Sequence, residues 1–107
     1  MGVIHVVQLK FNPEVDSKKI DEILSSLKAL KDSCVRPGTQ KKYITSLRAA
    51  ADCSIEGFQN GFTHMVVTEF DSIADRDYYA TKDPIHLALG AGLPPFVAGL
   101  QVLDIEG

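Results

Sequence analysis

Five side chains in this sequence are the main candidates for acid–base chemistry, namely the three histidines and two adjacent tyrosines: His5, His64, His86, Tyr78 and Tyr79. His86 comes directly after Asp83-Pro84-Ile85, a pattern that predicts the first turn of a helix. The helix macrodipole disfavours a positive charge there, so we expect His86 to stay neutral near pH 7 and able to accept a proton. A tyrosine from the preceding helix can reach the same pocket as a hydrogen-bond donor. The competing interpretation is that His86 only caps the helix and that both tyrosines are ordinary packing residues.

The other two histidines lie in segments that alternate like β-strands. His5 belongs to the run 3–11 and His64 to the run 62–70, and strand parity puts each of them on a largely apolar face, His64 together with Phe62. A lone histidine on an apolar face is usually a hydrogen-bonded core residue. Two of them on the helix-covered side of one sheet favour a cavity that both histidines line.

The residues that could bind a metal do not have the spacing of a metal site. No two histidines show HxH, HxxxH or HExxH spacing, and Cys34 and Cys53 do not form a CxxC motif. We expect both cysteines to be small buried thiols in a reducing compartment. The sequence has no glycine-rich phosphate loop and no nucleophile elbow, so nucleotide chemistry and covalent catalysis have no support. We therefore expect neither a metal nor an organic cofactor.

Periodicity and capping residues predict the elements that position these side chains. Strands are expected at residues 3–11, 41–49, 62–70 and 101–105, with Tyr43, Thr45 and Leu47 on one face of the second. A helix capped by Asp16 carries apolar residues at the 3.6-residue period, which predicts a one-sided helix lying on a sheet. Residues 72–75 have the form of a capping box, and the proline after Asp83 ends that helix and opens a new short one. The predicted order is β-α-β-β-α-α-β.

Helices on one face would leave the other side of the sheet uncovered. Strand alternation puts apolar residues on that side: Ile4, Val6, Met65 and Val67. Such a surface is too apolar to face water, and the edges of an open sheet are unpaired as well. Two α+β sheets laid face to face would close a barrel, so we expect a homodimer.

Length and charge limit the partners of the chain. Its 107 residues fall in the range of one domain, so residues 1–107 are expected to form a single domain. The net charge of −3 and the scattered lysines give no basic surface, which argues against nucleic acid as a partner. No apolar run approaches the roughly 18 residues needed to cross a bilayer, and no signal peptide is evident. We therefore expect a cytoplasmic protein that has no membrane partner.

Four stretches of the chain, taken in order, resemble one known family. They are residues 3–11 (VIHVVQLKF), 61–64 (GFTH), 77–79 (DYY) and 83–86 (DPIH). The family is the stress-responsive A/B barrel (Dabb) family, and the resemblance runs over nearly the whole chain. It implies a ferredoxin-like α+β fold, with a four-stranded antiparallel sheet that has helices on one face and pairs into a dimeric α/β barrel.

The resemblance also implies roles for particular residues. One plant member of the family is a polyketide cyclase, which closes a linear tetraketide thioester by aldol condensation without a metal or an organic cofactor. By resemblance to it, His86 is the catalytic base and Tyr79 stabilises the oxygen that becomes negative. His5 and His64 would line the pocket, and Tyr78 and Phe62 are further candidates for contacts with the substrate. The chain differs from that cyclase in having Leu27 at the place of a pocket tyrosine and one more residue between the catalytic tyrosine and histidine.

Three functions are compatible with these residues. The first is a cofactor-free cyclase or lyase that acts on a polyketide-like carbonyl substrate through the His86 and Tyr79 pair. The second is a non-catalytic, stress-associated protein that binds a small hydrophobic ligand, because nothing beyond that pair demands catalysis. The third is a cofactor-independent monooxygenase, which rests on analogy with related folds alone.

Overall fold

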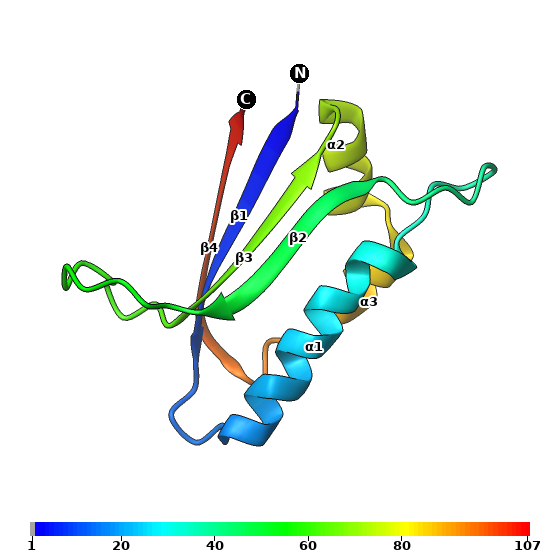
Figure 1. Cartoon of the computed structure of the whole chain (residues 1–107). Helices are drawn as coiled ribbons and strands as arrows, with labels where there is room; N and C mark the ends of the chain where they lie inside the picture. Colours follow the sequence, from blue (N-terminus) through cyan, green and yellow to red (C-terminus); the bar gives the residue numbers. More distant parts are fainter. Residues whose placement is uncertain (1) are drawn as a thin grey trace.

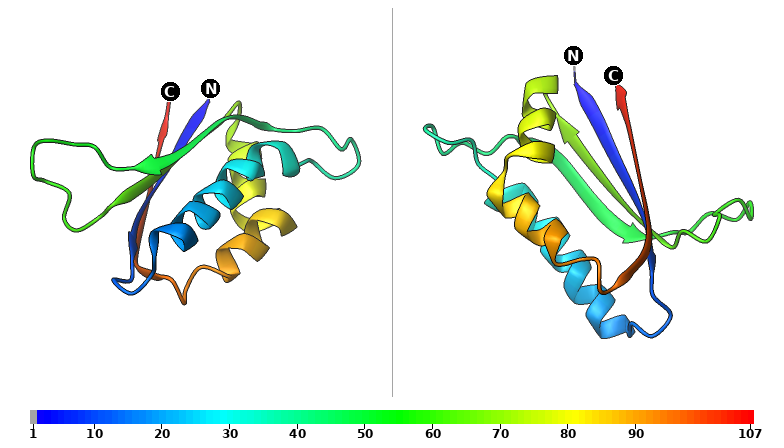
Figure 2. Two further views of the ribbon diagram at one scale, coloured as in Figure 1. Left: turned by 60° about the horizontal axis from the view of Figure 1, so that its bottom comes forward. Right: turned by 180° about the vertical axis from the view of Figure 1, so that it is seen from behind.

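A computed structural model describes residues 2–107 of the chain. The elements of this part follow the predicted order: β1 (Val3–Phe11), α1 (Ser17–Ser33), β2 (Ile44–Ala51), β3 (His64–Phe70), α2 (Ile73–Thr81), α3 (Pro84–Ala91) and β4 (Val97–Glu106). The four strands form one antiparallel sheet in the order β2-β3-β1-β4. Figures 1 and 2 show the three helices on one side of this sheet. The predicted α+β class, with helices on one face of an antiparallel sheet, is confirmed.

The first strand lies in the interior of the sheet, as its two apolar faces indicate. β1 pairs with β3 along one edge and with β4 along the other. In this register His5 lies between Thr68 of β3 and Asp104 of β4. Strand pairing thus brings an acidic residue from near the C-terminus beside a histidine from near the N-terminus.

Side-chain caps determine where the three helices begin. Asp16, Ser72 and Asp83 each have extended backbone and each accept a hydrogen bond from a backbone N–H of the first helical turn. Such caps satisfy donors that the helix itself cannot pair. The cap at Asp83 and the proline that follows it separate α2 from α3, so the chain changes direction there and His86 falls in the first turn of α3.

The core lies between the helices and the side of the sheet that they cover. Its buried side chains include Leu9, Ile23, Leu27, Leu30, Val66, Phe70 and Tyr79. The apolar stripe predicted for α1 supplies three of these, which confirms that α1 is a one-sided helix lying on the sheet.

Three strands have bounds that differ from the predicted ones. β2 spans 44–51 rather than 41–49, β3 starts at residue 64 rather than 62, and β4 spans 97–106 rather than 101–105. A register shift between Ile44 and Ser46 marks a bulge in β2. Tyr43 is buried, Thr45 is exposed and Leu47 is half-buried. Tyr43 and Leu47 both pack toward the core, so the prediction that Tyr43, Thr45 and Leu47 share one face is wrong for Thr45, where a bulge breaks the two-residue period.

The helices leave the other side of the sheet uncovered. Met65 of β3 is 42% exposed on that side, and Leu103 and Ile105 of β4 are 62% and 63% exposed. These side chains continue the apolar surface that the sequence predicts from β1 and β3. The sheet therefore presents a broad apolar face that nothing within residues 2–107 covers.

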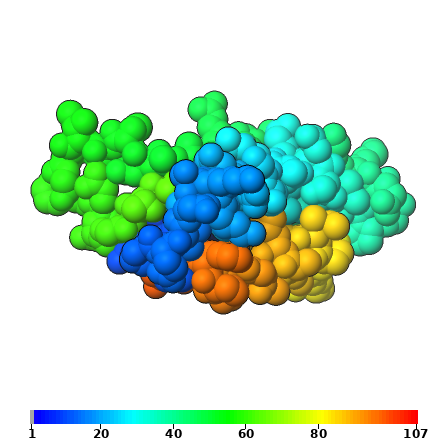
Figure 3. All heavy atoms as spheres, turned by 90° about the horizontal axis from the view of Figure 1, so that it is seen from below, coloured from blue at the N-terminus to red at the C-terminus, as the bar shows by residue number. Residues whose placement is uncertain are grey.

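A long connection between β2 and β3 projects from the body of the molecule, and we call residues 52–63 the arm. Figure 3 shows it in green, standing apart from the helices. Asn60 and Gly61 have positive φ values of 54° and 85°, which turn the chain back into β3. Ile55 and Phe58 are 99% and 81% exposed, so the arm carries two large apolar side chains in solvent.

Candidate functional site

A cavity lies between the sheet and the two short helices. Its volume is ≈ 530 Å³, within the range of small-molecule sites. Most of its wall is apolar and comes from all strands except β2 and from all three helices. The polar side chains in the wall are those of His5, Thr68, Tyr79 and His86. An apolar enclosure with a few convergent polar groups is typical of a ligand site.

His86 has one ring nitrogen occupied and the other free. Its Nδ1 lies 2.7 Å from the backbone oxygen of Tyr79, and its ring stacks on the Tyr79 ring with centroids 3.9 Å apart. A carbonyl oxygen can only accept a hydrogen bond, so Nδ1 carries the hydrogen and Nε2 keeps its lone pair. A neutral His86 is thereby held in the tautomer of a general base.

Burial keeps the imidazole of His86 neutral. It lowers the pKa of His86 below the ordinary 6.5, and the proximity of His5 lowers it further, while the Tyr79 carbonyl and Asp83 act in the opposite direction. The direction agrees with the expectation of a neutral histidine, but the largest cause is desolvation rather than the helix macrodipole. At pH 7 this side chain is a base and not an acid.

The lowered pKa predicts a loss of stability in mild acid. The folded protein binds a proton at His86 less readily than the unfolded chain, so the free energy of unfolding should fall as the pH drops below about 6.5 and level off below the folded pKa. His64, whose pKa burial also lowers, acts in the same direction. Urea unfolding between about pH 5 and 8 measures the effect. The His86→Gln variant should lose part of this dependence, and an unchanged profile would contradict the prediction.

The two tyrosines lie on different sides of α2. Tyr79 is buried and lines the cavity, and burial raises its pKa far above the ordinary value, so it stays a protonated donor. Tyr78 lies outside the cavity, where its ring meets Tyr43 with centroids 5.5 Å apart and Arg36 stacks over it at 4.6 Å. Consecutive helical residues point about 100° apart, so Tyr79 faces the cavity while Tyr78, which is half-buried, packs between Tyr43 and Arg36.

His5 also packs against the Tyr79 ring, edge-on. Its ring centroid is 5.8 Å from that of Tyr79, and its Nδ1 lies 2.7 Å from Asp104 Oδ1. The cavity therefore brings together three of the residues singled out in the sequence: His5, Tyr79 and His86.

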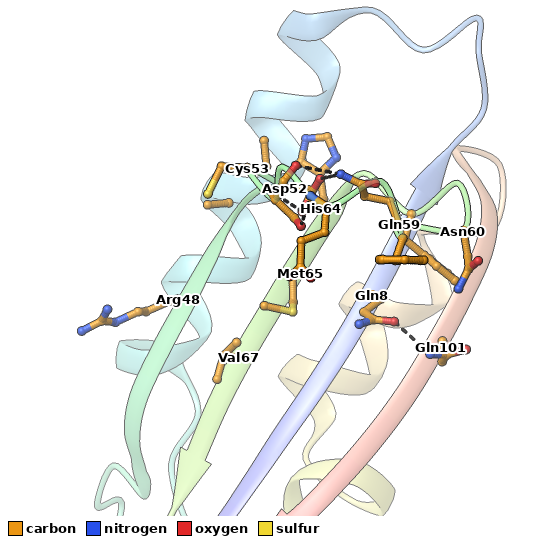
Figure 4. Close-up of a pocket in the computed structure, with 16 residues that line it drawn as sticks. Gln8, Arg48, Asp52, Cys53, Gln59, Asn60, His64, Met65, Val67 and Gln101 are labelled. Carbon is orange, nitrogen blue, oxygen red and sulfur yellow. Dashed lines mark hydrogen bonds between the residues drawn. The ribbon is translucent and has the colours of Figure 1, made fainter.

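His64 and Phe62 line a different hollow, next to the arm. It has a volume of ≈ 670 Å³ and lies between the arm and the uncovered side of the sheet. Figure 4 shows the ring of His64 pointing away from Met65. That ring packs edge-on against Phe11 at 5.0 Å, and its Nδ1 lies 2.8 Å from the Thr63 hydroxyl. The role of His64, Phe62 and Tyr78 in binding a substrate stays a prediction, and the structure does not place these three in the cavity of His86.

Sequence reasoning recognised Asp83 as a helix cap but missed its further partner. Asp83 is 1% exposed, and its Oδ1 accepts hydrogen bonds from the backbone N–H groups of Ile85 and His86 at 2.9 and 3.3 Å. Its Oδ2 accepts a hydrogen bond from the Tyr43 hydroxyl at 2.5 Å. Tyr43 thus ties the end of the connection before β2 to the first turn of α3. No local pattern could have found this contact, because the two residues are 40 positions apart.

The two cysteines are free and lie in different surroundings. Cys34 is buried, and burial raises the pKa of its thiol to about 12, so it is an inert core residue. Cys53 is exposed. The expectation of a buried thiol is therefore wrong for Cys53, because this residue lies in the arm.

Within residues 2–107, no group of three or more His, Cys, Asp or Glu side chains is arranged so that it could hold a metal ion. None of the helices in these residues has the length and the apolar character of a membrane span.

The fold and the cavity define a small α+β protein with a ligand-sized pocket under its helices. The sequence profile of the family described as "Stress responsive A/B Barrel Domain" (Dabb) matches residues 3–106. The chain belongs to this family, which confirms the resemblance seen in the sequence. A comparison with curated protein sequences found no significant match.

Solved structures share the fold at low sequence identity. A protein from Arabidopsis thaliana is 24% identical, with a TM-score of 0.81 and coverage of 98% of this chain and 94% of that chain. The hydroxynitrile lyase from Passiflora edulis is 22% identical, with a TM-score of 0.82 and coverage of 97% and 91%. A dimeric ferredoxin-like protein from Jannaschia is 23% identical, with a TM-score of 0.79 and coverage of 100% of both chains. The ferredoxin-like fold is thereby confirmed.

Proposed function

We propose that this protein is a cofactor-free lyase or cyclase that acts on a polyketide-like carbonyl compound in the cavity of His86. The observation that carries the proposal is the pairing of a proton acceptor and a proton donor at one place: the free Nε2 of a neutral His86, stacked on the protonated Tyr79. Carbon acids beside carbonyl groups need such a base together with a donor for the oxygen that becomes negative.

The chemistry would proceed without any covalent bond to the protein. His86 Nε2 takes a proton from the carbon between two carbonyl groups. The resulting enolate carbon then forms a bond to the carbon of another carbonyl group, farther along the same molecule. The oxygen of that carbonyl gains the negative charge, the Tyr79 phenol stabilises it by a hydrogen bond, and the proton on His86 is returned to it. The hydroxynitrile lyase among the structural relatives shows that a protein of this fold can be a lyase.

The wall of the cavity fits a substrate with an apolar portion. Leu27 is buried in it, and Leu100 and Val102 of β4, which are 53% and 46% exposed, stand on the more open side. Apolar side chains at this position favour a hydrocarbon chain over a charged group. The same wall supports the second candidate function, a non-catalytic stress-associated protein that holds a small hydrophobic ligand.

We further propose that two copies of the chain pair through the uncovered side of the sheet. The apolar side chains there, Met65, Leu103 and Ile105 among them, need cover from water. The structural relative from Jannaschia is described as dimeric. Two sheets packed face to face would complete the A/B barrel. The proposal puts this homodimer in the cytoplasm, because its two cysteines are free thiols.

The replacement of His86 by alanine tests the proposed reaction. Incubation with a poly-β-ketoacyl thioester should give a cyclised product with the wild-type protein, and His86→Ala should lower the rate by a factor of ~10²–10⁴, the usual contribution of a general base. Tyr79→Phe should lower it by about 10². Leu87, which is 43% exposed on the same helix, provides the control Leu87→Ala, which should keep the wild-type rate.

Mass spectrometry of the products separates the two candidate functions. A product that forms at the same rate with wild type and His86→Ala would remove His86 from the mechanism. A hydrophobic ligand that binds in the cavity and keeps its mass after prolonged incubation would support the binding protein instead.

A further inference from the structure

A chain of three polar side chains from three separate elements ends at the cavity. Asp104 of β4 uses one carboxylate oxygen for His5 of β1, at 2.7 Å, and the other for Arg76 of α2, at 2.6 Å from Nη1. The side chains of these three residues are 9%, 20% and 26% exposed, in the order His5, Asp104 and Arg76. Arg76 also donates from Nε to the exposed Asp77 at 2.8 Å. The carboxylate of Asp104 therefore has a fixed orientation, with one partner on each oxygen.

This orientation determines which nitrogen of His5 carries a hydrogen. A carboxylate only accepts hydrogen bonds, so Nδ1 of His5 must donate, and in the neutral ring Nε2 is then an acceptor. His86 has the same arrangement, with Nδ1 donating to a backbone oxygen. The cavity thus holds two imidazoles of the same tautomer, each in contact with the Tyr79 ring.

An acceptor in a largely apolar wall discriminates between ligands. A ligand oxygen that carries a hydrogen, as in an enol, a phenol or an alcohol, can donate to Nε2 of a neutral His5. An ether or a carbonyl oxygen at the same place would face a lone pair and would leave Nε2 unpaired, which costs binding free energy. We propose that Asp104, held by Arg76, is a positioning residue that fixes the tautomer of His5 and so selects ligands that present an O–H group to His5 Nε2.

The proposal rests on the proposed function only in taking the cavity as a ligand site. It adds a requirement on the substrate: besides the carbonyl groups that react near His86 and Tyr79, the molecule has an enol or hydroxyl group on the side of His5. A β-diketone in its enol form meets this requirement, since the O–H and the carbonyl lie within one short segment.

The variant Asp104→Asn gives the sharpest test, because Arg76 dictates how the new amide must turn. Arg76 has only donors, so the amide oxygen should face it and the amide NH₂ should face His5. An NH₂ group donates, so Nδ1 of His5 would become the acceptor and the hydrogen would move to Nε2. The exposed partner of Arg76 provides the matched control Asp77→Asn, which should leave the tautomer of His5 unchanged.

NMR of protein with ¹⁵N-labelled histidine, recorded in mildly alkaline buffer, measures the tautomer of His5 directly. Wild type and Asp77→Asn should show His5 protonated on Nδ1, and Asp104→Asn should show it protonated on Nε2. A wild-type protein protonated on Nε2 would overturn the proposal even if the variant failed to fold. An unchanged tautomer in folded Asp104→Asn would overturn it as well.

The dissociation constants of two matched probes, one with an O–H group and one without, measure the selectivity of the cavity. Because Nε2 of His86 is a second acceptor in the same cavity, both proteins in this test carry His86→Ala. The protein with Asp104 should bind 4-butylphenol about tenfold more tightly than its methyl ether, 4-butylanisole, and Asp104→Asn should lose this preference. An equal preference in both proteins would contradict the proposal. These outcomes do not depend on turnover, so they are distinct from a failure of the proposed reaction, which the loss of activity in His86→Ala tests.

Discussion

The Asp83→Ala variant should lose about 3 kcal/mol of its free energy of unfolding, because one buried carboxylate satisfies three donors. Loss of a helix cap costs about 1–2 kcal/mol. The Tyr43 hydroxyl would then be left buried without its acceptor, which costs about 1–3 kcal/mol more. Urea unfolding measures the change. The first turn of α3 should also loosen, since the backbone N–H of His86 loses its partner.

Two controls separate the contributions to this loss. Tyr43→Phe removes one hydrogen bond and leaves the cap, so it should cost less than Asp83→Ala. Ser72 caps α2 through its hydroxyl alone, and Ser72→Ala should cost about 1 kcal/mol. If Asp83→Ala cost no more than Ser72→Ala, Asp83 would be an ordinary cap and its contact with Tyr43 would carry no stability.

The Leu103→Asp variant should convert the proposed homodimer into monomers at micromolar concentration. Leu103 is 62% exposed on the uncovered side of the sheet, where it lies opposite Val6 of β1. In a two-fold dimer the change occurs twice in one interface, and a carboxylate buried without a partner is costly. We expect the dissociation constant to rise by at least about 100-fold, equivalent to about 3 kcal/mol.

Sedimentation velocity over a range of concentrations measures the change in mass. Ile73 is 40% exposed at the start of α2, on the helix side, and Ile73→Asp provides a control with the same change of side chain. This control should remain dimeric. A Leu103→Asp protein that dimerises as tightly as wild type would exclude the uncovered face as the interface.

The sequence predicted the elements well where the signal is local. The apolar period of α1 and the caps at Asp16, Ser72 and Asp83 depend on residues that are close in the sequence, and the structure confirms them. The placement of β1 inside the sheet also followed from its two apolar faces. Each of these features depends on residues only a few positions apart.

The site was less predictable, because its geometry depends on pairing between distant segments. Strand parity put His64 on the helix side, but it could not show that Phe11 packs against its ring at the start of β3. The contact of Asp104 with His5 joins residues 99 positions apart and follows only from the register of β1 with β4. The prediction from alternation in β2 failed at the bulge near Thr45, because no residue type in this segment indicates a bulge.

The interior position of β1 has a consequence for how the chain folds. Its register with β4 runs from Val3 opposite Glu106 to Phe11 opposite Val97, so β1 cannot complete its pairing until β4 has been synthesised. Until then, one edge of β1 has no neighbour from its own chain. Contacts of such long sequence separation slow folding relative to helical proteins of equal size, and the exposed edge of β1 during synthesis is where chaperones would be expected to act.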